Sequence, residues 1–98
     1  MAHTCHAHGC KTVVAPKMLF CHPHWFGTRK ALQNAIWNEY RVGQEDRKDP
    51  SLRYLAIQQL CVSELAHRPP GNRAIATEYA SRAETFRQRA MDAGEGDA

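Results

Sequence analysis

The chain has 98 residues, 43% of them hydrophobic, and its 13 basic residues exceed its 10 acidic ones to give a net charge of +3. This length suits a single domain with a modest core, and the small charge disfavours a dedicated nucleic-acid binder. No apolar run approaches the length of a membrane span, and Met1–Thr4 lacks the basic start and apolar core of a secretion signal. We therefore expect a protein of the reducing cytosol without a membrane partner.

Two close pairs of potential metal ligands occupy the first quarter of the chain. Four residues separate Cys5 from Cys10, two separate Cys21 from His24, and ten lie between the pairs. Zinc takes four nitrogen or sulfur ligands in a tetrahedron, and a short loop that carries a close pair supplies two of the corners. The spacing therefore predicts a Cys3His site for Zn2+.

The fourth ligand and the chemistry of the site have alternatives. His6 or His8 would replace His24 in a less regular loop, and a further possibility leaves the cysteines reduced or joined in disulfides. Disulfides are disfavoured in a reducing cytosol, where clustered cysteines more often bind metal. A catalytic site needs an open coordination position and a nearby carboxylate, but the first acidic residue in the chain is Glu39. We therefore expect a closed, structural site.

The residues around the first pair predict a turn followed by a hairpin. Gly9 can adopt the positive φ that a tight turn around a metal needs. The runs at 11–14 and 18–20 are β-prone and flank a proline turn. This pattern predicts a small hairpin over residues 11–20.

The second pair is predicted to lie at the start of a helix. Pro23 suits the first helical turn, where its missing N–H group does no harm, so Cys21 and His24 would lie on one face of that turn. A turn, a hairpin and a helix start resemble the treble-clef zinc finger, a likeness of fold that assigns no function. Residues 1–28 form the predicted zinc-binding module.

Downstream of this module, helices are predicted at 29–41, 50–68 and 73–92, as a three-helix bundle within 29–93. The middle helix has an apolar arc wide enough to pack on two sides, and the Pro-Pro-Gly sequence after it predicts an antiparallel helix pair. The glycine-rich residues 94–98 are expected to form a flexible tail. The predicted fold class is thus mainly α, in one domain. The wide arc would equally suit a homodimer contact, so the oligomeric state stays open.

The sequence also predicts which residues cap the helices and which allow two helices to pack closely. Thr28, Asp49 and Asn72 are the predicted N-caps of the three helices. In the third helix, Ala76 and Ala80 are expected to permit close approach of its neighbour.

Burial is predicted at two further places. Trp25 and Phe26 follow the second ligand pair directly and are expected to close over the metal loop. Cys61 lies in a strongly apolar helical segment, so we expect a small buried hydrophobe of low reactivity.

A longer pattern runs from the motif into the second of these helices. It comprises Cys5-His6-Ala7-His8-Gly9-Cys10, Pro16, Met18-Leu19, Cys21, His24-Trp25, Leu32-Gln33, Trp37, Tyr40-Arg41, Gly43-Gln44, Pro50-Ser51 and Tyr54-Leu55. Over about residues 5 to 57 the chain resembles a family of small zinc-finger-like proteins encoded by bacteriophages and prophages of proteobacteria. Family members usually have Val-Pro where this chain has Thr28-Arg29. The resemblance implies a zinc site, a phage origin and the cytoplasm of a bacterial host, but no established activity.

The sequence favours binding over catalysis. It contains no nucleophile–base pair, no carboxylate pair within reach of the metal and no phosphate-cradling loop, so we expect no enzyme. Small phage proteins of this kind often dock on a host or defence-system protein, and anti-defence inhibitors of CRISPR effectors are one example. The predicted docking residues are Trp37, Tyr40, Arg41 and Gln44, because Trp, Tyr and Arg dominate interface hot spots. The three-residue spacing of Trp37 and Tyr40 is more often found in a core than at an interface.

Nucleic acid is the alternative partner. Residues 1–41 carry five basic residues against one acidic residue, and a basic surface is what phosphate contacts need. A zinc-finger protein that binds DNA or RNA would use Lys11, Lys17, Arg29 and Lys30.

Overall fold

The computed structural model describes residues 3–15, 18–40, 51–68 and 71–94. In these ranges it contains the strands β1 (His3–Thr4) and β2 (Val13–Val14) and the helices α1 (His22–Gly27), α2 (Lys30–Glu39), α4 (Leu52–His67) and α5 (Arg73–Asp92). The helices have 6, 10, 16 and 20 residues and so make up more than half of the chain, which confirms a mainly α fold. Among the described helices, none combines the length and apolar character that crossing a membrane requires.

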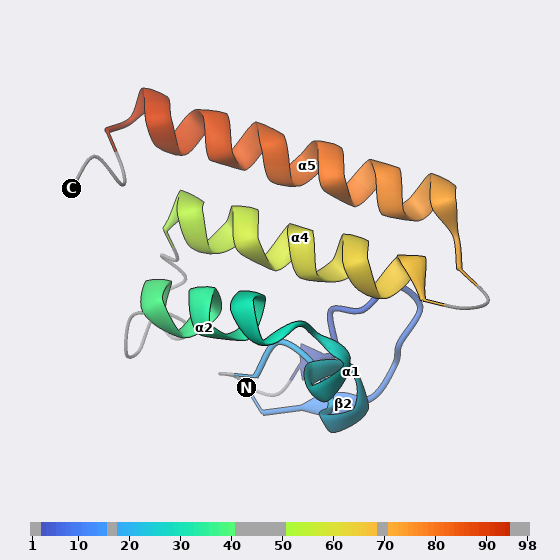
Figure 1. Ribbon diagram of the computed structural model, residues 1–98. Coiled ribbons are helices and arrows are strands. Elements are labelled where there is room, and N and C mark those ends of the chain that lie inside the picture. The colour runs from blue at the N-terminus through green and yellow to red at the C-terminus, as the bar shows by residue number, and fades with distance from the viewer. Residues whose placement is uncertain (1–2, 16–17, 41–50, 69–70, 95–98) are drawn as a thin grey trace.

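Helix α4 is the centre of the fold. Figure 1 shows α2 and α5 on opposite sides of it, each running antiparallel to it, and α1 with the strands near its C-terminal end. The prediction of a central helix packed on two sides is thus confirmed. The predicted three-helix bundle is not, because the described parts of α2 and α5 are separated by α4 instead of packing on each other.

Small residues form the contact between α4 and α5. Ala76, Ala83 and Ala90 are the buried residues of α5, and their spacing of seven places them along one side of the helix. The hydroxyl of Ser63 in α4 donates a hydrogen bond to the carbonyl oxygen of Ala76 at 2.7 Å. Ala76 therefore lies at the close contact, as predicted. Ala80, one helical turn further along the same side, is exposed and lines a cavity between α5 and α4 with Ala56 and Leu60.

The N-terminal strands pair differently from the predicted hairpin. An antiparallel pair is present, but β2 pairs with β1, so that His3 lies opposite Val14 and Thr4 opposite Val13. The segment that was predicted as the second hairpin strand instead contacts the loop that follows Cys5, where the carbonyl oxygen of Leu19 accepts a hydrogen bond from the backbone N–H of His6 at 2.9 Å. The prediction of a hairpin over residues 11–20 was therefore wrong in its strand partner.

Two helix N-caps use side chains, and one of them is the predicted residue. The carbonyl oxygen of the Asn72 side chain accepts from the backbone N–H of Ile75 at 3.1 Å, as predicted. Helix α4 is capped by the hydroxyl of Ser51, which accepts from the backbone N–H of Tyr54 at 3.0 Å. The cap thus falls two residues after the predicted Asp49, which lies outside the described residues.

The predicted cap of α2 was wrong. Its N-cap residue is Arg29, which makes no side-chain capping bond. The hydroxyl of Thr28 donates instead to the carbonyl oxygen of His24 at 2.9 Å. The Thr28 side chain therefore bonds a carbonyl group near the end of α1 and does not cap the start of α2.

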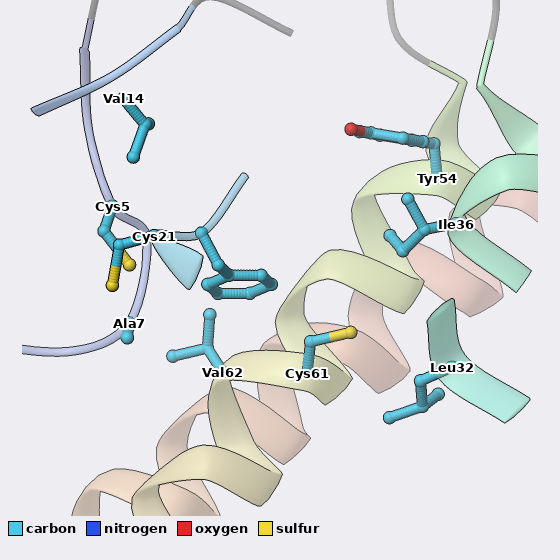
Figure 2. Packing of buried hydrophobic residues seen from close by; sticks show 10 residues of the cluster. Cys5, Ala7, Val14, Cys21, Leu32, Ile36, Tyr54, Cys61 and Val62 are labelled. Atoms are coloured by element: carbon cyan, nitrogen blue, oxygen red, sulfur yellow. The ribbon is translucent and has the colours of Figure 1, made fainter. Parts of the chain in front are cut away.

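One hydrophobic core joins the N-terminal loop to the helices (Figure 2). Its ten buried members are Cys5, Ala7, Val14, Phe20, Cys21, Leu32, Ile36, Tyr54, Cys61 and Val62. Phe20 is the largest fully buried side chain, at 1% exposure, and lies in this cluster with Val62 of α4. The loop that carries the metal-ligand motif is thus part of the core.

Replacement of Ser51 by alanine tests the cap of the central helix. Ser51→Ala leaves the N–H of Tyr54 without its acceptor and should lower the free energy of unfolding by about 1 kcal/mol, measured by urea denaturation. Ser81→Ala is the matched control, because Ser81 is exposed inside α5, and it should change stability by less than about 0.5 kcal/mol. Equal effects of the two changes would contradict the capping role.

Candidate metal centre

Four ligand atoms converge at one point in the N-terminal loop. The Sγ atoms of Cys5, Cys10 and Cys21 and a ring nitrogen of His24 all lie within 4.8 Å of one another. Nδ1 of His24 is 3.4 Å from Sγ of Cys5 and 3.2 Å from Sγ of Cys21, and the sulfurs of Cys10 and Cys21 are 4.0 Å apart. Tetrahedral bonds of about 2.3 Å to sulfur and about 2.0 Å to nitrogen place ligand atoms roughly 3.5 to 3.8 Å apart. The cluster is therefore compatible with a tetrahedral metal site.

The first ligand pair is positioned by a tight turn. Gly9 has a φ of +80°, as predicted, and the backbone N–H of Cys10 donates to the carbonyl oxygen of Ala7 at 3.0 Å. The backbone N–H of Cys5 donates to the carbonyl oxygen of Thr12 at 2.8 Å, next to the β1–β2 pair. The turn thereby brings the two thiols to the same side of the loop.

The second pair is positioned by the start of α1. Cys21 is the N-cap residue of this helix, and Pro23 lies in its first turn. His24 follows one turn after Cys21, so both side chains project from the same side of the helix start. Of the histidines, His24 belongs to the cluster, whereas the ring of His6 lies against His3 and that of His8 against Tyr79.

The thiols of the cluster differ in their ease of ionisation. Burial raises the pKa of the Cys5 thiol, although backbone hydrogen bonds from Cys21 and Ala7 act in the opposite direction. The pKa of Cys10 is lowered by hydrogen bonding with Thr12, whose hydroxyl oxygen is 3.4 Å from the sulfur. A bound dication would favour the thiolate form of all these ligands. Within the described residues no carboxylate joins the cluster.

Cys61 takes no part in this site. Figure 2 shows its side chain on α4, apart from the sulfur atoms of Cys5 and Cys21. It is fully buried, and burial raises its pKa to about 12. The structure thus agrees with the prediction of a small buried hydrophobe.

The apolar cover of the metal loop comes from a different residue than predicted. Phe20, directly before Cys21, is buried, whereas Phe26 is 71% exposed and its ring lies edge-on to His22. Trp25, its neighbour in α1, is partly buried and packs against the core. The prediction that Phe26 covers the loop was therefore wrong.

An aromatic pocket lies beside the metal centre. It has a volume of about 310 Å³ and is lined by Met18, Leu19, Phe20, Trp25, Ile36, Trp37, Tyr40 and Tyr54. The ring centroid of Trp37 is 6.3 Å from that of Trp25 and 5.7 Å from that of Tyr40, with the rings nearly perpendicular in both pairs. No lining residue is charged.

The pocket includes two of the predicted docking residues. Trp37 is 56% exposed, so it is a surface residue at the edge of the pocket and not part of the core. Tyr40 is half-buried beside it. Arg41 and Gln44 lie outside the described residues. Tyr54 of α4 completes the pocket. This role could not be predicted from the sequence, because nothing local links Tyr54 to α2.

Of the basic residues predicted to contact nucleic acid, only some are free to bind phosphate. The guanidinium group of Arg29 forms a two-pronged ion pair with Glu64 of α4, with hydrogen bonds of 2.8 and 2.6 Å. Lys11 and Lys30 are exposed. Lys17 lies outside the described residues. The bond to Glu64 offsets the charge of Arg29 and so weakens the basic surface.

Comparisons with protein-family models, curated proteins and solved structures each found no match to the chain. The resemblance to a phage-encoded family therefore stays a prediction.

Thiol alkylation tests the electrostatics of the cysteines. In protein freed of metal by a chelator, iodoacetamide near neutral pH should modify Cys10 first and Cys61 last, because only a thiolate reacts and burial keeps Cys61 protonated. Peptide mapping by mass spectrometry at several reaction times gives the order. In denaturant all four cysteines should react at similar rates. Early modification of Cys61 in the folded chain would contradict its burial.

Proposed function

We propose that the chain is a non-enzymatic binding protein, stabilised by zinc, that docks on another protein through the aromatic pocket. The observation that carries this proposal is Trp37, a large apolar side chain that is 56% exposed at the edge of an uncharged pocket. Exposed tryptophan and tyrosine next to a preformed pocket are typical of interface hot spots. Leaving such a side chain in water has no benefit for the isolated fold.

Zinc is the metal that suits the donor set best. Three thiolates and one imidazole are soft to borderline ligands, and four protein ligands in a tetrahedron leave no open position for catalysis. Cys5, Cys10, Cys21 and His24 would hold the ion. Bound zinc would supply a cross-link between the turn at Gly9 and the start of α1, in a domain whose strands have only two residues each.

A host protein is the partner class that the phage resemblance suggests. Docking in the bacterial cytoplasm would let a protein of this size block a host or defence complex by occupying a binding surface. Anti-defence inhibition of the anti-CRISPR type is one form of such action. The nucleic-acid alternative has less support, because Arg29 is already bonded to Glu64.

Substitution of single histidines tests the zinc site. Purified protein should contain one zinc ion per chain, and His24→Asn should lose it and lower the melting temperature by more than about 10 °C. His22→Asn is the matched control: His22 is in the same helical turn but its ring lies against Phe26. His8→Asn should also retain the metal. Elemental analysis and thermal unfolding give both readouts, and a full zinc content in His24→Asn would refute the assignment.

Paired aromatic substitutions test the docking surface. Trp37→Ala should lower the affinity for a purified bacterial partner by roughly thirtyfold or more. The circular dichroism spectrum should stay unchanged, which shows that the variant is folded. Phe26→Ala removes a similarly exposed aromatic outside the pocket and should bind normally. Tight binding to a DNA or RNA duplex at 0.2 M salt, unaffected by Trp37→Ala, would instead favour the nucleic-acid alternative (ionic strength of about this value removes weak phosphate contacts).

A further inference from the structure

The interior of the aromatic pocket selects for an apolar group. All eight lining residues are uncharged, five of them are aromatic, and the innermost, Phe20, is 1% exposed. A charged group placed there would lose its water shell without gaining a partner. The volume of about 310 Å³ exceeds what one large side chain needs, so a residue such as leucine, methionine or phenylalanine could enter.

Among the residues that the structure describes, the charge near the pocket that has no ion pair is positive. Two ion pairs are formed by charged residues of α2 and the residue before it: Arg29 pairs with Glu64, and Glu39 with Arg53 at 3.8 Å. Lys30 is exposed and has no ion pair within the described part of the chain. It lies seven residues before Trp37 in α2, which is two helical turns or about 10 Å along the same exposed side. A partner seated on the pocket therefore meets a positive charge about 10 Å from its apolar anchor.

We propose that the pocket binds a protein segment that inserts one large apolar side chain and places a carboxylate on Lys30. This inference rests on the proposed function, because it describes the partner of the same pocket. In an extended segment the side chains on one face repeat every second residue, at about 7 Å and then about 14 Å. With the reach of the lysine side chain, the acidic residue would therefore lie two or four positions from the apolar one. The charge complementarity sets the register of the segment, and the apolar anchor supplies most of the affinity.

Selection from a random peptide library tests this inference. The full zinc-loaded chain is immobilised, and peptides that it retains are sequenced. We expect them to share a large apolar residue with an aspartate or glutamate two or four positions away. One selected peptide is then synthesised with a fluorophore, and its affinity is measured by fluorescence anisotropy at low and high salt.

Variants of the chain separate the two contributions. Trp37→Ala should weaken binding of the peptide at least about tenfold at either salt concentration. Lys30→Glu should weaken it at low salt and have little effect at high salt, because exposed charges are screened. Arg89→Glu is the charge-matched control, since Arg89 is exposed on α5 on the other side of α4, and it should bind as the wild type does.

The outcomes distinguish this inference from the proposed function. Peptides that depend on Trp37 but lack acidic residues, or that bind Lys30→Glu normally at low salt, would overturn the inference and leave protein docking in place. Failure to select any peptide that depends on Trp37, together with normal binding of the purified bacterial partner by Trp37→Ala, would overturn both.

Discussion

The meeting of four ligand atoms at one point is the constraint on which the N-terminal half of the structure depends. The local elements there are short: β1 and β2 have two residues each and α1 has six, and elements of this size are not stable alone. Cys5, Cys10, Cys21 and His24 come from different places in this region, and the short strands and α1 alone would hold these places together only weakly. Because Phe20 is adjacent to Cys21, the geometry of the cluster also holds the largest fully buried side chain against α4.

The longer helices could be predicted from the sequence, whereas the strand pairing could not. Helices α4 and α5 have 16 and 20 residues, enough for apolar periodicity to be visible, and Asn72 marks the start of α5 by a local bond. Strands of two residues show no alternation, and Val13–Val14 pairs with His3–Thr4 because the turn at Gly9 folds Cys5 back toward Cys10. The role of Thr28 could not be predicted either, because its hydroxyl group lies between two helices and can bond the end of the first or cap the start of the second.

The ligand set could be read from residue spacing, but the aromatic pocket needed the fold. Its lining comes from the segment before Cys21, from α1, from α2 and from α4, which are far apart in the sequence. Ile36 and Trp37 are neighbours in α2, yet one is 4% exposed and the other 56%. Which of two adjacent apolar residues faces inward depends on the side that α4 covers. Since Phe20 and Trp25 each adjoin a ligand of the cluster, the shape of the pocket also depends on the closure of the metal loop.

The packing of α4 on α5 has a consequence for how the chain acquires its structure. These helices are sequence neighbours, and their contact relies on alanines spaced by seven and on the bond from Ser63 to Ala76. Contacts between neighbouring segments cost little chain entropy and form early in folding, whereas the metal cluster must join residues from four places in a loop. A newly made chain can thus gain its helical hairpin without any ion. With zinc bound as proposed, the supply of metal in the surrounding cell would act on the last step of maturation, the one that completes the surface beside the loop.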